Sequence, residues 1–109
     1  MSDTPTFDRG LCHIALVVRE MDRSREFYEP FAGLRLVHER RAEGRISRVA
    51  WLAHPRTAFA VVLVESNQLD DTPLGPFGHI GLACRDQGEV DRLADLARRR
   101  GILRSPPVQ

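Results

Sequence analysis

The sequence predicts an α+β protein in which one βαβββ unit is followed by the beginning of a second, similar unit. The octapeptide at residues 13–20, HIALVVRE, recurs at residues 79–86 as HIGLACRD. Each copy precedes a polar, helix-like stretch that closes at a glycine, Gly33 or Gly101, and three further segments of strand type follow the first helix. Because internal repetition defines the architecture of a chain, the two copies are expected to occupy equivalent places.

The first strand is predicted over residues 11–18. Side chains on a strand point alternately to opposite faces. The aliphatic residues at positions 14, 16 and 18 therefore share one face, which suits packing beneath a helix. His13, Ala15 and Val17 share the other face, where the small alanine leaves room beside the imidazole.

A helix is predicted over residues 22–31, with Asp22 as its N-cap and Gly33 as its stop. Phe27, Phe31 and Leu34 recur at helical spacing and are expected to face the sheet. Pro30 removes a backbone hydrogen bond and clashes with the preceding turn, so the helix is expected to be short or irregular near its end.

Three more strands are predicted, over residues 34–41, 46–53 and 58–65. Short turns at residues 42–45 and 54–57 join them, which favours an antiparallel meander. The middle strand carries Val49 and Trp51 on one face. These segments complete the first module, residues 11–65.

Residues 66–78 are predicted to be a linker, because they are rich in Asp, Pro and Gly and show no periodicity. The second module, residues 79–109, is expected to begin with a strand over the repeat. Asp86 and Glu89 then form a capping-box-like start to a helix over residues 87–100. Its apolar stripe contains Val90, Leu93, Leu96 and Ala97. Gly101 ends this helix, and residues 102–104 are of strand type, so a single domain with an incomplete second module is expected.

The composition is that of one soluble globular domain, with 42% hydrophobic and 28% charged residues among 109. A formal net charge of +1 creates no broad field that favours nucleic acid or an anionic membrane. No apolar run approaches the ~20 residues that span a bilayer, and the first ten residues lack the features of a secretory signal. Cys12 and Cys84 are expected to be reduced thiols in a cytoplasmic protein.

His13 and His79 stand at the same position of two equivalent strands, each followed two residues later by a very small residue. If the two units pack with pseudo-twofold symmetry, the two imidazoles converge. Two imidazoles and a carboxylate form a binding site for a divalent transition metal. The alternative is that each histidine is a satisfied core residue, and the repeat leaves the two interpretations evenly weighted. His38 and His54 are expected at the surface, and Tyr28 is expected to be structural.

The pattern H-I-x-L-x-x-R-[DE], with SREFY at residues 24–28 and Gly33-Leu34 after it, resembles the vicinal oxygen chelate superfamily. Its members include glyoxalase I, extradiol dioxygenases, methylmalonyl-CoA epimerase and the bleomycin- and fosfomycin-resistance proteins. The resemblance covers residues 11–104. It implies paired βαβββ modules whose curved sheets enclose a metal-centred cleft. It also implies a homodimer, because the cleft commonly depends on module pairing.

By this resemblance, His13 and His79 match the metal ligands on the first strand of each module. The strand-four ligand of the family, often Glu or Gln, falls at Leu63, which cannot bind a metal, or at Glu65. Glu65 shares a face with Leu63 and is therefore a candidate that points into the cleft; a solvated carboxylate at a strand end is the alternative. The last ligand of the family, a Glu on the final strand of module two, would lie beyond residue 109.

The resemblance implies a divalent-metal-dependent enzyme, a dioxygenase or a glyoxalase-like lyase or isomerase, that acts on a small molecule with adjacent oxygens. Fe(II), Zn, Ni and Mn all accept histidine and carboxylate ligands. A rival expectation is a non-catalytic protein that sequesters an antibiotic or metabolite in the same cleft, which Leu63 at a ligand position favours. A third is a degenerate member whose role is assembly. The expected partners are a small molecule and a second copy of the chain.

Overall fold

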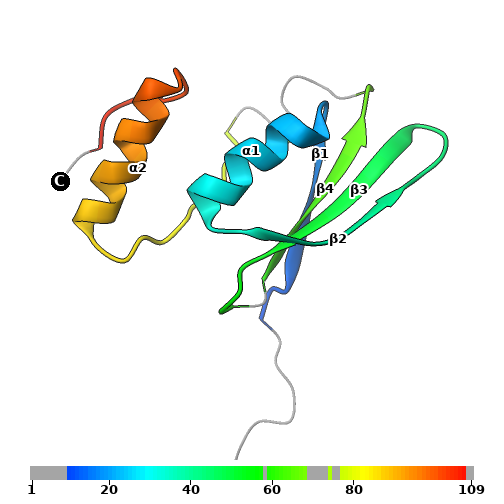
Figure 1. Cartoon of the computed structure of the whole chain (residues 1–109), viewed down its shortest axis with the longest axis horizontal. Helices are drawn as coiled ribbons and strands as arrows, with labels where there is room; N and C mark the ends of the chain where they lie inside the picture. Colours follow the sequence, from blue (N-terminus) through cyan, green and yellow to red (C-terminus); the bar gives the residue numbers. More distant parts are fainter. Residues whose placement is uncertain (1–9, 58, 69–73, 75–76, 108–109) are drawn as a thin grey trace, which may run out of the picture. The chain divides into compact units, whose positions relative to one another are not determined.

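The computed structural model describes residues 10–57, 59–68, 74 and 77–107. The chain divides into two compact units, Met1–Gly78 and His79–Gln109. The first contains β1 (His13–Val18), α1 (Met21–Ala32), β2 (Arg35–Arg41), β3 (Ile46–Ala53) and β4 (Ala60–Ser66), and the second contains α2 (Gln87–Arg99) (Figure 1). The α+β class and the βαβββ order of the first unit are confirmed.

The first unit is a four-stranded sheet with the strand order β1-β4-β3-β2. Strands β2, β3 and β4 form the antiparallel meander expected from their short turns. Strand β1 lies parallel to β4 at the edge of the sheet. Parallel neighbours need a long connection, and here it comprises α1, β2 and β3, which lie between the two strands in the sequence.

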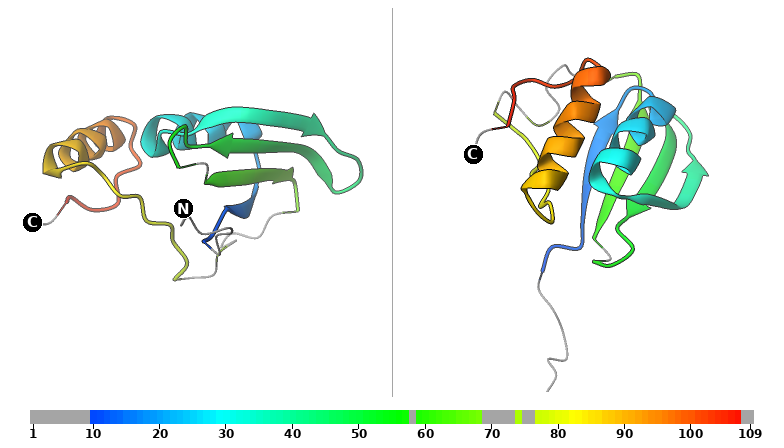
Figure 2. Two further views of the ribbon diagram at one scale, coloured as in Figure 1. Left: turned by 90° about the horizontal axis from the view of Figure 1, so that it is seen from below. Right: turned by 60° about the vertical axis from the view of Figure 1, so that its left-hand side comes forward.

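Helix α1 covers one face of the sheet (Figure 2). The hydrophobic core lies between the helix and the sheet. The core consists of Leu16, Met21, Leu34, Ala50, Leu52, Val61 and Leu63. Its largest fully buried side chains are Met21, Leu52 and Leu63, and burial of such a side chain contributes about 1.5–3 kcal/mol to folding. Ile14 and Val18 pack against this cluster, so the expectation that the aliphatic face of the first strand lies beneath a helix is confirmed.

The beginning of α1 differs from the prediction. The helix starts at Met21, its N-cap is Glu20, and Glu20 makes no side-chain capping hydrogen bond. Asp22 therefore lies within the first turn instead of capping it. The backbone N–H of Met21 is satisfied by a side chain from β4, which no local sequence pattern reveals.

The apolar stripe predicted for α1 is confirmed only in part, since Leu34 lies in the core. Tyr28 and Ala32 pack against the core, whereas Phe27 is 41% exposed and stacks on Phe31, with 5.1 Å between the ring centroids. The helix nevertheless runs through Pro30 to Ala32, although Pro30 lacks the N–H that would donate to a carbonyl of the preceding turn. Gly33 ends it with φ of 66°, as predicted.

In the second unit, α2 begins and ends as the sequence predicts. The Asp86 carboxylate accepts a hydrogen bond from the Glu89 N–H at 2.9 Å, and the Glu89 carboxylate accepts one from the Arg85 N–H at 2.7 Å. Gly101, with φ of 74°, ends the helix. The hydrogen bonds from the N–H groups of residues 101 and 102 to the carbonyls of residues 98 and 97 form a Schellman motif.

The strands predicted at residues 79–84 and 102–104 do not form, since both segments lack regular secondary structure. The topology of the first unit gives the reason. There the equivalent segments, β1 and β2, pair with β4 and β3 and not with each other. The described part of the second unit contains no counterpart of β3 or β4, so these segments have no neighbour to satisfy their backbone groups. Most of the predicted linker, residues 66–78, lies outside the described residues.

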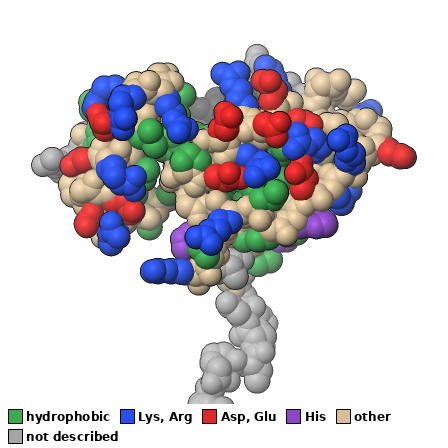
Figure 3. Space-filling model, viewed as in Figure 1, with side chains coloured by type: hydrophobic (Ala, Val, Ile, Leu, Met, Phe, Trp, Pro, Cys, Tyr) green, Lys and Arg blue, Asp and Glu red, His purple; other side chains and the backbone are tan. Residues whose placement is uncertain are grey.

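Charged side chains of both signs are interspersed on the face of the molecule shown in Figure 3, in keeping with the net charge of +1. Neither helix in the described part of the chain has the length and apolar character needed to cross a membrane.

Candidate functional site

The register of the sheet determines which side chains share a face. His13 of β1 lies beside Ala60 of β4, Ala60 beside Ala53 of β3, and Ala53 beside Arg35 of β2. Neighbours across strands point to the same side, so three such rows form a grid on the side of the sheet away from α1. We call it the His13 face. Its members are His13, Ala15 and Val17 on β1; Ala60, Val62 and Val64 on β4; Val49, Trp51 and Ala53 on β3; and Arg35, His38 and Arg40 on β2.

His13 is exposed at the start of β1. Its ring lies 5.4 Å from that of Trp51, with 47° between the planes, so the two rings meet across the small Ala60 and Val62 positions of β4. The Cys12 Sγ atom lies 3.1 Å from His13 Nδ1. This contact orients the imidazole and leaves Nε2 as the nitrogen that can bind a ligand.

The centre of the His13 face is apolar. Val49, Ala60 and Val62 are buried, although α1 covers the opposite face. The half-buried Trp51 lies next to Val62 in the register and reaches toward His13, which accounts for part of this burial. The arrangement is an imidazole and an indole on an aliphatic floor.

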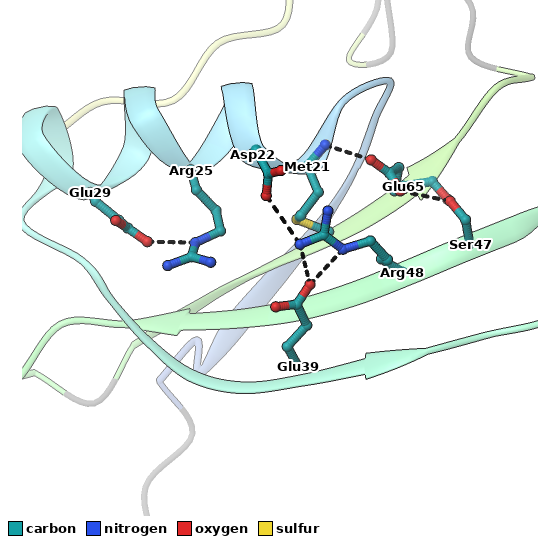
Figure 4. Close-up of polar contacts among 8 residues, drawn as sticks. All are labelled: Met21, Asp22, Arg25, Glu29, Glu39, Ser47, Arg48 and Glu65. Carbon is teal, nitrogen blue, oxygen red and sulfur yellow. Dashed lines mark hydrogen bonds and ion pairs between the residues drawn. The ribbon is translucent and has the colours of Figure 1, made fainter.

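Glu65 lies on the other face of the sheet. In the register it pairs with Val18, five residues along from the His13–Ala60 pair, which corresponds to about 16 Å along the strand. Its Oε2 atom accepts a hydrogen bond from the Met21 N–H at 2.6 Å, and its Oε1 atom accepts one from Ser47 Oγ at 2.7 Å (Figure 4). The structure therefore does not bring Glu65 and His13 together. Glu65 is half-buried at the end of β4, where these two hydrogen bonds hold its carboxylate.

The role that the contacts assign to Glu65 is to cap α1. A carboxylate at a helix N-terminus satisfies a donor that has no partner within the helix and interacts favourably with the helix dipole. The hydrogen bond from Met21, and then the one from Ser47, lower the pKa of Glu65. Nearby, Arg48 bridges the carboxylates of Glu39 and Asp22 (Figure 4), and these two groups raise the pKa of Arg48.

Leu63 also lies on the α1 side, fully buried beside Leu16 and Ala50. The prediction that Leu63 and Glu65 share a face is confirmed, but it is the face opposite His13. The three positions of β4 that do share a face with His13 carry Ala60, Val62 and Val64, none of which can bind a metal. Which side chains of β4 share a face with His13 depends on how β4 is aligned with β1, and the sequence alone does not contain this alignment.

The remaining candidates are dispersed. His79 is exposed in the second unit, and its convergence with His13 stays a prediction. His38 is exposed on β2, as expected, whereas His54 is half-buried and its Nδ1 accepts a hydrogen bond from the Arg56 N–H at 3.0 Å.

Tyr28 packs against the core, and its burial raises the pKa of the phenol. Both cysteines are free thiols. Among the described residues, no three His, Cys, Asp or Glu side chains gather in a group that could hold a metal.

Comparison with known families extends these observations over nearly the whole chain. The model of the family described as the Glyoxalase/Bleomycin resistance protein/Dioxygenase superfamily matches residues 10–108. The chain belongs to this superfamily. A superfamily-type fold is also found in solved structures. A possible glyoxalase from Bacillus cereus has a TM-score of 0.67 at 19% identity, over 86% of this chain and 76% of its own.

A second similar structure is the E126Q mutant of the fosfomycin resistance protein FosX from Listeria monocytogenes, in complex with Mn(II) and 1S,2S-dihydroxypropylphosphonic acid. Its TM-score is 0.70 at 15% identity, over 87% of this chain and 71% of its own. In sequence, an uncharacterized protein of Pseudomonas aeruginosa, PA2024, is 34% identical over 95 residues, which cover 85% of this chain and 66% of that protein. The chain thus spans just under two thirds of the length of this relative.

The donor set of this chain fits a divalent metal in part. Two exposed imidazoles, those of His13 and His79, are ligands of the right type for a transition metal. The carboxylate suggested on β4 does not fit, because Glu65 is hydrogen bonded on the opposite face of the sheet.

Proposed function

We propose that the protein binds a small organic molecule with adjacent oxygens on the His13 face, and that His13 and His79 are ligands of a divalent metal ion. The observation that carries this proposal is the position of His13. Its imidazole is exposed on the sheet face away from α1, is oriented through Nδ1 by Cys12, and keeps Nε2 for a ligand. When bound, the metal would supply Lewis acidity toward an oxygen of the substrate.

The residues of this chain would have distinct tasks in such a site. His13 would bind the metal through Nε2, while the Cys12 thiol fixes the plane of the ring. Trp51, against the imidazole, would cover the apolar part of the substrate and exclude water. His79 supports the proposal because it stands at the same place in the repeated sequence. Superfamily membership supports it as well, with a reaction of the lyase, isomerase or dioxygenase type.

The metal content of the purified protein tests this proposal. The wild type is expected to hold about one divalent metal per chain. His13→Ala and His79→Ala are each expected to lower the affinity for the metal. The loss should exceed the factor of about 10–100 that follows removal of a residue that only supports a ligand. The matched control is His38→Ala, an exposed histidine on the same sheet face. Metal binding that is unchanged in both variants, with folding verified by circular dichroism, would contradict the proposal.

A second candidate function is the binding of a small molecule without a metal. The apolar side chains of Ala60, Val62 and Val64, where β4 shares a face with His13, favour it. In that case no form of the protein holds metal, and a chelator leaves the affinity for the ligand unchanged.

We also propose that the protein acts as a homodimer. The superfamily membership supports this, as does the second unit, in which Ile80, Leu82 and Ile102 are 39–52% exposed. Burial of such side chains at a contact between copies is favourable. Light scattering coupled to size-exclusion chromatography is expected to give twice the mass of the chain, and a monomer at all concentrations would contradict the dimer.

A further inference from the structure

The two faces of the sheet differ in how their charges are compensated. On the α1 side, Arg48 is paired with the carboxylates of Asp22 and Glu39, and Glu65 caps the helix (Figure 4). On the His13 face, none of the twelve grid positions carries Asp or Glu. The acidic side chains of the sheet in its described part thus lie on one side and leave the other without negative charge.

The cationic groups of the His13 face stand along one strand. Arg35, His38 and Arg40 occupy the three β2 positions of the grid, and we call them the β2 rim. All three are exposed. Arg35 and Arg40 make no ion pair with any described residue, in contrast to Arg48, which has two. The rim therefore carries two guanidinium groups whose charge the described part of the chain leaves uncompensated.

The grid also sets the spacing between the rim and His13. Three strand-to-strand steps separate β1 from β2, which places Arg35 about 14 Å from His13 in the row that they share. Arg40 lies two rows further along β2. Between them lie only aliphatic side chains and Trp51. Guanidinium groups bind carboxylates and phosphates through two parallel hydrogen bonds, and the poorly polar surface beside them strengthens such a contact.

We propose that the β2 rim binds an anionic group of the ligand, so that the substrate class is an elongated molecule with an apolar or aromatic middle and an anionic end. The apolar part lies over Trp51. Arg35 and Arg40 stand one row to either side of the Trp51 row, and either guanidinium group can hold the anionic end. The His13 end of this arrangement rests on the proposed function. The rim itself does not require a metal.

The whole chain can be tested with two probes of nearly the same shape, 2-naphthoate and its uncharged amide, 2-naphthamide. Trp51 is the single tryptophan of the chain, so its indole N–H signal in NMR titrations reports binding at this face. The wild type is expected to prefer naphthoate at least about tenfold, and Arg35→Gln combined with Arg40→Gln is expected to remove the preference while the affinity for naphthamide stays unchanged. Such a tenfold preference equals about 1.4 kcal/mol.

The matched control is Arg41→Gln. Arg41 is the exposed neighbour of Arg40, and in the register it lies beside Arg48 on the α1 side. This variant is expected to keep the preference. An open cavity of about 550 Å³ at β2 is lined by Glu39, Arg40, Arg41 and Arg48. If Arg41→Gln weakened naphthoate binding as much as the double variant, the anion would bind in that cavity and the rim proposal would be overturned.

Two further outcomes separate this inference from the proposed function. If the double variant keeps the preference and His13→Ala loses it, the anion binds at the His13 end, which overturns the rim proposal and leaves the metal proposal intact. If the protein holds no metal but the double variant loses the preference, the rim proposal stands and the metal proposal falls. A wild type without any preference for naphthoate overturns the rim proposal directly.

Discussion

Replacing Leu63 with glutamate is expected to lower the free energy of unfolding by at least about 4 kcal/mol, a large part of the stability of an ordinary domain. Leu63 is fully buried in the core beneath α1, beside Leu16 and Ala50. The variant loses apolar contacts worth about 2–5 kcal/mol. It also places a carboxyl group without a partner among aliphatic side chains, which costs about 1–3 kcal/mol more. Urea unfolding followed by Trp51 fluorescence measures the change.

Val64→Glu is the matched control, because Val64 is the next residue of β4, is half-buried and points to the His13 face. It is expected to cost less than about 2 kcal/mol. Equal stability of the two variants would show that the faces of β4 have been assigned wrongly. The comparison also tests whether the strand-four position at Leu63 faces the core or a metal site. A glutamate at this position that faces the core cannot reach a metal bound by His13.

Replacing Glu65 with glutamine is expected to cost about 1–2 kcal/mol at neutral pH, because the variant loses the charged cap on α1. The hydrogen bonds from Met21 and Ser47 lower the pKa of Glu65 in the folded protein. The unfolded chain, with a glutamate pKa of about 4.3, therefore binds more protons than the folded one in acid. The contribution of Glu65 to stability is complete above about pH 5 and is lost as the pH falls through the lowered pKa of the folded protein.

Chemical unfolding of the wild type and Glu65→Gln at a series of pH values between about 7 and 3 tests this expectation. The difference in stability between the two proteins should shrink as the pH falls. Glu43→Gln, at an exposed position in the β2–β3 turn, is the control for the loss of one carboxylate. A difference that stays constant over the whole range would mean that the Glu65 carboxylate is not what caps α1.

The secondary structure of the first unit was accessible from sequence because its signals are local. Alternating side chains, turn residues and the glycine at position 33 gave the bounds of its strands and helix within two residues. Long-range information decided the rest. Phe27 and Phe31 have the same spacing as residues of a buried stripe, yet Tyr28 and Ala32 are the ones that contact the core. In the second unit, strand-like residues 79–84 form no strand, because a strand also requires a neighbour.

The sequence predicted the residue types of the candidate site better than it predicted where those residues lie. The alternation within β1 correctly separated His13 from the aliphatic core face. Alternation within β4 correctly grouped Leu63 with Glu65, but only the register shows that this group faces α1. The β2 rim was missed for the same reason. In the sequence, this strand shows only charged residues at its edges. The alignment of β2 with β3 is what places Arg35, His38 and Arg40 on the His13 face.

The parallel pairing of β1 with β4 has a consequence for the newly made chain on the ribosome. Residues 19–59 separate the two strands. At synthesis rates of about 5–20 residues per second, β1 leaves the ribosome roughly 2–8 s before its partner is made. Throughout that time His13–Val18 is an apolar segment with neither of its edges paired, while β2 and β3 can already form a hairpin. The strand that carries His13 is therefore among the first to be synthesised and the last to be joined to the sheet.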